Sequence, residues 1–174
     1  MAVESRTARL FIHMRHVMSE PSFSVSGKPL KSTPQTVTNG EPFWPDLDLA
    51  ELQGSRTLPA DLPDDTAAMA LLAAVAEVNT TLAQVVVHWK AQGHERAADV
   101  PGARLGDETQ LVAQYKKAVY ARAKADLMGE FATIGRRETY PGQESEDTRA
   151  TLLAEASLVM RNMLGHRRAG VHII

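Results

Sequence analysis

The stretch from Asp64 to Ala91 constrains the fold of this chain more than any other part of its sequence. It contains neither glycine nor proline, and alanine, valine and leucine dominate it. Its larger apolar side chains recur at alternating spacings of four and three residues, which places them on one face of an α-helix. These residues are Leu71, Val75, Val78, Leu82, Val85 and Trp89. We therefore predict one continuous helix from Asp64 to Ala91, capped by Gly93.

The composition of the whole chain also favours helices. Of its 174 residues, 44% are hydrophobic but only 5% are aromatic, a balance that suits helix packing better than a β-sandwich or barrel. The 19 Lys and Arg residues are offset by 21 Asp and Glu residues, so the chain lacks the strongly basic character of a duplex-binding domain. The absence of cysteine excludes disulfides, thiol catalysis and cysteine-based zinc sites. No apolar run approaches the roughly 18 residues of a membrane helix, so no membrane partner is expected.

Two more long helices are predicted further along the chain. The first begins near Asp107, which can cap it, and the second ends at Gly165. Their apolar residues again follow helical spacing, namely Leu111, Val112, Tyr115, Ala118 and Val119 in the first and Leu152, Leu153, Ala156, Val159, Met160 and Met163 in the second. The predicted fold is all-α, an antiparallel helical bundle of three long helices plus a short one that runs through Leu52 and is stopped by Gly54.

Three parts of the chain differ in composition. Residues 1–42 are predicted to form a flexible, extended N-terminal arm, because Ser, Thr, Pro and Gly are abundant between Ser19 and Pro42 and no apolar period is sustained there. Residues 43–165 are predicted to form the helical domain. Residues 166–174 would then be a C-terminal tail.

Two aromatic residues stand where the arm meets the helical domain. In Phe43-Trp44-Pro45-Asp46-Leu47-Asp48, the proline restricts the backbone and Asp46 is placed to cap the short helix. We expect Phe43 and Trp44 to anchor the arm on the core. For Asp46 and Asp48, capping and solvation is the main interpretation. A metal site or an acid/base pair is the alternative, and it lacks a third ligand nearby.

The helix that begins near Asp107 is the most basic in the chain. Its cations include Lys116, Lys117, Arg122 and Lys124. One interpretation is a face that is solvated or paired with acidic side chains. The other is a surface turned toward DNA, for example the wall of a channel through which DNA passes.

The last residues of the chain combine charge with β-prone apolar side chains. Arg167 and Arg168 precede Ala169 and Gly170, and the chain then ends in Val171, His172, Ile173 and Ile174. Because an apolar tail in water favours aggregation, we expect it to pack against something. Its own core and another subunit, to which it would add a strand, are both open.

The usual enzyme signatures are missing from the sequence. It contains no Walker-type phosphate loop, no Gly-x-Gly-x-x-Gly turn, no Gly-x-Ser-x-Gly elbow and no His-Glu-x-x-His pair. Histidines such as His88 and His94 come without a third metal ligand. We therefore expect no catalytic residue, no metal and no cofactor.

The order of the features described so far resembles that of a known family. The features are the motif from Phe43 to Asp48, the alanine-rich helix, Gly93 followed by Ala98-Asp99-Val100-Pro101, a helix with Tyr115 and Tyr120, and a terminal Val-His-Ile-Ile. Over roughly Glu41 to Ile174, the chain resembles the head-completion proteins of contractile-tailed temperate phages of the Peduovirus type.

The resemblance implies a helical adaptor that forms a homo-oligomeric ring, a dodecamer, beneath the portal protein after packaging. Such a ring would stabilise the filled head, admit double-stranded DNA to its channel and seat a neck or tail-terminator protein. The protein would be assembled in the bacterial cytoplasm and reside at the head-tail neck of the virion. Val171 to Ile174 would be the leading portal contacts, with Arg167 and Arg168 pairing with carboxylates on the partner.

Two other classes of function stay open at the level of sequence. A small helical nucleic-acid-binding module for packaging or regulation would need a clustered basic recognition helix. An enzyme would need a convergent polar cluster in a pocket.

Overall fold

The structure, a computed structural model, describes residues 35–58, 62–134 and 146–166. Its helices are α1 (Leu49–Ser55), α2 (Asp64–Thr81), α3 (Ala83–Ala91), α4 (Gln110–Ile134) and α5 (Glu146–Met163), with a short 3-10 turn η1 (Ala97–Asp99). Two antiparallel strand pairs join β1 (Thr36–Val37) to β2 (Leu47–Asp48) and β3 (Arg104–Leu105) to β4 (Glu108–Thr109). The all-α class is confirmed, with these short strands in addition.

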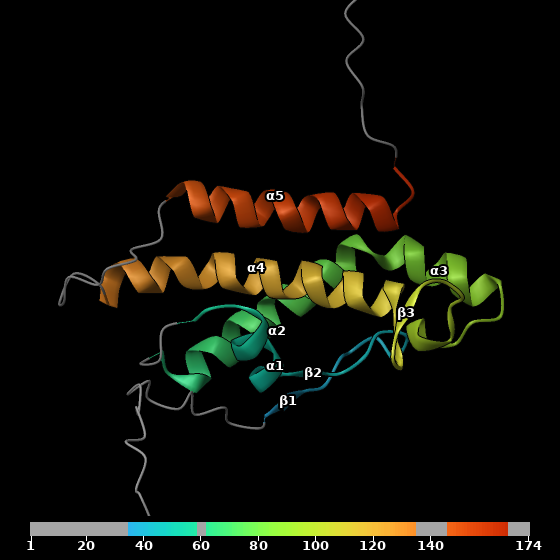
Figure 1. The fold of residues 1–174 in the computed structure, drawn as a ribbon, viewed down its shortest axis with the longest axis horizontal. Helices are drawn as coiled ribbons and strands as arrows, with labels where there is room; N and C mark the ends of the chain where they lie inside the picture. The colour runs from blue at the N-terminus through green and yellow to red at the C-terminus, as the bar shows by residue number, and fades with distance from the viewer. Residues whose placement is uncertain (1–34, 59–61, 135–145, 167–174) are drawn as a thin grey trace, which may run out of the picture.

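Helix α4 lies at the centre of the molecule. Helix α5 runs antiparallel to it along one side, and α2 crosses it on another side (Figure 1). Four consecutive α4 residues, Ala118, Val119, Tyr120 and Ala121, are all buried. A helix that is buried all round forms the core of a bundle, and the alanines let its neighbours approach closely.

The helix predicted from Asp64 to Ala91 is broken at Leu82, so the prediction of one continuous helix is wrong. Leu82 leaves the helical conformation with φ −93° and ψ 10°, and α2 and α3 meet there at 57°. The hydroxyls of Thr80 and Thr81 donate to carbonyls one turn back, at 2.8 and 3.0 Å, and such bonds bend helices. The bend keeps Leu82 fully buried and lets α3 bury Val85 and Val86.

Two predicted helix starts are also wrong. Asp48, not Asp46, caps α1, because its carboxylate accepts from the backbone N–H of Ala50 at 2.7 Å. Helix α1 then continues past Gly54 to Ser55. Helix α4 is capped by Thr109, whose hydroxyl accepts from the N–H of Val112 at 3.3 Å, while Asp107 lies in the turn between β3 and β4.

Residues 35–42, which the composition assigns to the arm, lie in the folded part of the molecule. Strand β1 places Thr36 opposite Asp48 and Val37 opposite Leu47. Val37 and Asn39 are both buried. We call residues 35–48 the docked segment. Residues 1–34 lie outside the described ranges.

The two glycine caps predicted at helix ends are confirmed. Gly93 has φ 88° and its N–H donates to the carbonyl of Lys90, and Gly165 has φ 74° and its N–H donates to that of Asn162. A left-handed conformation of this kind is accessible to glycine without steric cost.

Within the described ranges, no single helix has both the length and the apolar composition to cross a membrane. Helices α2 and α3 meet that criterion only together and across their bend. The core helix of a globular domain meets the same criterion, and the inner face of α2 is buried here.

Candidate functional site

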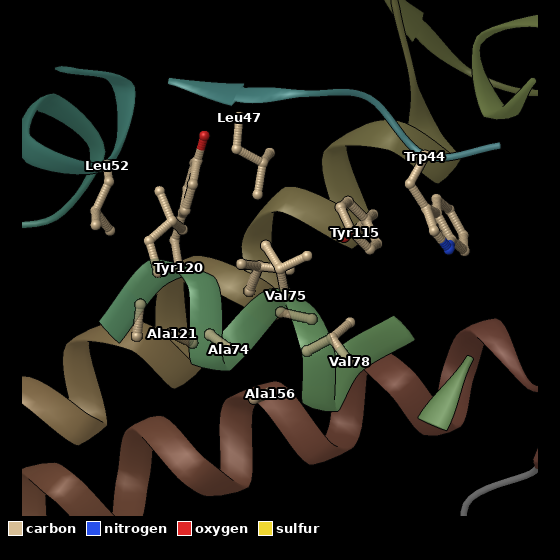
Figure 2. Close-up of a cluster of buried hydrophobic side chains, with 14 of the residues drawn as sticks. Trp44, Leu47, Leu52, Ala74, Val75, Val78, Tyr115, Tyr120, Ala121 and Ala156 are labelled. Carbon is tan, nitrogen blue, oxygen red and sulfur yellow. The ribbon is translucent and has the colours of Figure 1, made fainter. Parts of the chain in front are cut away.

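The docked segment is anchored by its two aromatic side chains. Phe43 and Trp44 are almost fully buried, and their rings meet edge to face with centroids 4.9 Å apart. Trp44 also stacks on Tyr115 of α4, with centroids 4.4 Å apart and ring planes within 7° (Figure 2). Burial of two large rings and an offset stack stabilises a contact by several kcal/mol, roughly 3 kcal/mol or more per ring. The aromatic pair therefore attaches the docked segment directly to α4.

Both aspartates of the motif bind backbone amides. Asp48 caps α1, and the Oδ1 atom of Asp46 accepts from the N–H of Asn39 at 2.8 Å. These bonds fix the turn between β1 and β2. Among the described residues no group of three or more His, Cys, Asp or Glu side chains is placed to hold a metal ion.

A buried polar cluster, formed by Asn39, Asn79 and Tyr115, joins the docked segment to α2 and α4. The Nδ2 atom of Asn39 donates to the Tyr115 hydroxyl at 2.7 Å, and this hydroxyl donates to Oδ1 of Asn79 at 2.8 Å. The Nδ2 atom of Asn79 closes the ring by donating to Oδ1 of Asn39, also at 2.8 Å. Burial raises the pKa of Tyr115 to about 12, although the bond from Asn39 opposes that rise. Each of the three side chains has hydrogen-bond partners within the cluster. Such a network fixes the docked segment, α2 and α4 in a single relative arrangement.

The residues of the Asn39 cluster carry no signal in the sequence that would predict this contact. Asn39 precedes a glycine in a polar stretch, which is typical of a turn, and Asn79 resembles an ordinary surface position on a helix. Only the contact between positions 76 residues apart reveals their role.

The basic residues of α4 form ion pairs within the chain. Lys116 contacts Glu51 of α1 at 2.8 Å and Glu108 of β4 at 3.1 Å. Burial alone would lower the pKa of Lys116, but its hydrogen bonds to the two carboxylates outweigh that effect and raise it.

The other three cations of α4 point elsewhere. Arg122 contacts Glu77 of α2 at 2.8 Å, and Lys117 lies 3.7 Å from Glu155 of α5. Lys124 is buried. Because these cations face different elements, they do not form one basic surface on the isolated chain.

Helix α5 is tied to the rest of the molecule by a further ion pair. Arg56, just after α1, donates two hydrogen bonds to the Glu155 carboxylate, at 2.9 and 3.3 Å. These bonds lower the pKa of Glu155, and desolvation opposes the shift. The predicted contacts at the end of the chain, Arg167, Arg168, Val171, His172, Ile173 and Ile174, lie outside the described residues.

Comparison with known proteins identifies the family. Residues 37–174 match the family described as "Phage head completion protein (GPL)". The chain belongs to this family. Among curated proteins, the "Probable head completion/stabilization protein" of Haemophilus phage HP1 (strain HP1c1) is 32% identical over 139 residues, which cover 80% of this chain and 93% of the relative. No solved structure matches significantly.

A phage head completion protein has a structural role at the head of the virion. The described part of this one buries its aromatic and polar motifs inside the bundle, so contacts with other molecules have to use other residues. Large apolar side chains are exposed on four elements. They are Met69 (68% exposed) and Leu72 (48%) on α2, Val87 (63%) on α3, Leu105 (84%) on β3 and Leu158 (42%) on α5.

Proposed function

We propose that this head completion protein binds as a ring to the portal of DNA-filled heads, stabilises the packaged DNA and forms the neck platform to which the tail attaches. The observation that carries the proposal is the family match, which spans residues 37–174 and so includes almost all of the described structure. The structure supports an assembly role through its compact bundle and the large apolar side chains exposed on α2, α3 and α5.

The mechanism in this proposal is steric. Docking of the ring on the portal prevents leakage of the packaged DNA, and the channel of the ring admits DNA. The C-terminal residues Arg167, Arg168 and Val171 to Ile174 are the proposed contacts with the portal. Lys117, with 56% of its side chain exposed, is the α4 cation best placed to face DNA, since Lys116 and Arg122 are more deeply buried in their ion pairs.

Complementation of a phage that lacks this gene tests the proposal. Without the protein, heads are expected to package DNA and then lose it, or to remain tailless. The intact chain should restore filled, tailed particles in electron micrographs. Restored DNA content without any of this protein in the purified particle would contradict a structural role in the virion.

Truncation after Gly170 tests the portal contact separately. We expect the truncated protein to keep its helical circular dichroism and melting temperature, because the described core lies upstream. It should fail to attach to DNA-filled heads. A truncated protein that attaches normally would show that the tail is not the contact, and one that unfolds would show that the tail belongs to its own core.

A further inference from the structure

Eighteen residues connect α3 to α4, and most of them lie on the surface. Residues 101–107 are all exposed. Hydrogen bonds nevertheless fix the course of the connection. The guanidinium of Arg104 donates to the carbonyl of Ala98 at 2.8 Å, and the Thr109 hydroxyl donates to the carbonyl of Ala97 at 3.0 Å. A connection that is long, ordered and exposed commonly carries a function.

The β3–β4 hairpin within this connection turns its leucine outward. Its register pairs Arg104 with Thr109 and Leu105 with Glu108. Paired residues share one face of a hairpin, and successive residues alternate between the two faces. Thr109 is only 1% exposed, so its face lies against the molecule, and the opposite face presents Leu105, which is 84% exposed. A hairpin that served only the fold would place its leucine on the inner face.

The backbone of the hairpin holds Leu105 in a defined position. Two residues connect the strands, and the first of them, Gly106, has φ 59°, which glycine adopts without strain. At the base of the hairpin, the N–H of Gln110 donates to the carbonyl of Ala103 at 2.8 Å and continues the pairing. An exposed apolar side chain on a rigid support loses little conformational freedom when a partner covers it. Leu105 therefore has the properties of an anchor for another protein.

The hairpin lies at the end of the bundle where the described chain stops. Strand β4 leads directly into α4, and α5 runs antiparallel to α4, so the end of α5 lies beside the start of α4 (Figure 1). Eight residues follow His166, and at about 3.5 Å per residue they reach at most about 28 Å. In the proposed function these residues bind the portal. The portal then has to come to the end of the bundle that carries the hairpin.

We propose that the β3–β4 hairpin is a second contact with the portal protein and that Leu105 enters an apolar pocket on the portal. The inference rests on the portal binding of the proposed function and names a rigid surface that takes part in it. Because the C-terminal residues hold the portal within reach, even a small second contact adds substantially to the affinity. Two contacts at one end of the bundle also fix the orientation of the subunit on the portal.

Photocross-linking in assembled particles tests the contact. Particles are assembled from the full chain with the photoreactive residue p-benzoylphenylalanine in place of Leu105, and the products of irradiation are identified by mass spectrometry. We expect the main product to join this protein to the portal. The matched control carries the same photoreactive residue in place of Met69, which is 68% exposed on α2, and should give no portal product.

A polar substitution gives a second readout. Leu105→Ser removes the apolar side chain without adding a charge, and it should leave the circular dichroism and the melting temperature unchanged because this side chain is exposed. Attachment of the variant to DNA-filled heads should be weaker by about tenfold or more, since an apolar anchor is lost from the contact. Leu105→Met keeps an apolar side chain of similar size and should attach normally.

Other results overturn the inference and leave the proposed function intact. If the photoreactive residue at position 105 joins two copies of this protein, joins a different virion protein or gives no product, the hairpin is not a portal contact. If the photoreactive chain is not incorporated, normal attachment of Leu105→Ser has the same meaning. A lower melting temperature of Leu105→Ser would show that the leucine serves the fold instead. Failure of the unmodified chain to rescue head completion would contradict the proposed function itself.

Discussion

The docked segment and α5 both complete the core around α4, but different interactions hold them there. The docked segment has little regular structure and is fixed by an aromatic stack, the Asn39 cluster and two aspartate bonds to backbone amides. Helix α5 satisfies its own backbone and is held by an apolar stripe, with the partly exposed ion pair of Arg56 and Glu155 at its edge. A short irregular segment needs directional contacts, such as hydrogen bonds and ring stacks, to fix its position. A helix is positioned by the packing of its side chains into the grooves of the neighbouring helix.

Removing the two aromatic anchors should detach the docked segment from α4 and cause the largest loss of stability. We expect Phe43→Ala with Trp44→Ala to lower the free energy of unfolding by about 5 kcal/mol or more, because two nearly fully buried rings are lost. Thermal or urea unfolding measures this. The control Met69→Ala alters an exposed side chain and should change stability by less than about 0.5 kcal/mol. If the double variant were as stable as that control, the docked segment would not be part of the core.

Removal of one hydroxyl group should loosen the docked segment and leave α5 in place. Tyr115→Phe keeps the stack with Trp44 but leaves buried amide groups of Asn39 and Asn79 without their partner, which we expect to cost about 2 kcal/mol. Hydrogen exchange should increase in residues 35–48 and stay unchanged in α5. Equal increases in both regions would mean that the two are not held independently.

The same variant should respond differently to alkaline pH. The pKa of Tyr115 is raised to about 12 in the folded protein, so the unfolded chain loses this proton first, near pH 10. The intact protein should therefore lose stability as the pH rises from about 10 to 12, and Tyr115→Phe should lack that component. Tyr120, whose pKa burial also raises, is present in both proteins and cancels in the comparison.

Enlarging one side chain on α5 should loosen α5 and leave the docked segment in place. Ala156 is almost fully buried against α4, and Ala156→Leu has no room without a shift of the helix. We expect a loss of about 1–2 kcal/mol and faster exchange in α5, with the docked segment unaffected. Ala154→Leu, on the exposed side of the same helix, is the control and should be neutral for the isolated protein.

Neutralising the ion pair on α5 should have the smallest effect. Because both partners are partly exposed, Glu155→Gln should cost about 0.5–1 kcal/mol at neutral pH. The pKa of Glu155 is lowered in the folded state, so its contribution is present above the ordinary value of 4.5 and is lost as the pH falls through the lowered value. The stability of the variant and of the intact protein should therefore converge as the pH falls below 4.5 and through that lowered value, and a difference that stays constant throughout the fall would exclude this pair as its cause.

Sequence reasoning succeeded where the determining interactions are local. The stripe on α2, the glycine caps and the helical pattern of α5 depend on residues within a few turns, and the structure contains all of them. The bend at Leu82 has only a weak local marker, the adjacent Thr80 and Thr81, because neither glycine nor proline is present. The burial of Leu82, Val85 and Val86 depends on tertiary packing that the sequence does not display. The sequence also does not distinguish Asp46 from Asp48 as the N-cap of α1, since both fit the pattern of a helix start.

The polar contacts were harder to predict because they depend on distant parts of the chain. Asn39 and Tyr115 form a pair only after α2 and α4 have packed, and Arg56 meets Glu155 across 99 positions. The cations of α4 looked like a candidate surface for DNA because a single helix does not show that α1, α2, β4 and α5 bring carboxylates to them.

The separation between Asn39 and Tyr115 also sets an order of events during synthesis. The docked segment leaves the ribosome before any of its partners on α4 exist, and 76 residues separate the two ends of that hydrogen bond. At about 5–20 residues per second, the segment waits about 4–15 s before it can dock. During that interval Phe43, Trp44 and Leu47 have no core to enter, so the nascent chain carries a temporary binding site for chaperones at the start of its fold. One of the first parts of the fold to be made thus reaches its place only after α4, further along the chain, has been synthesised.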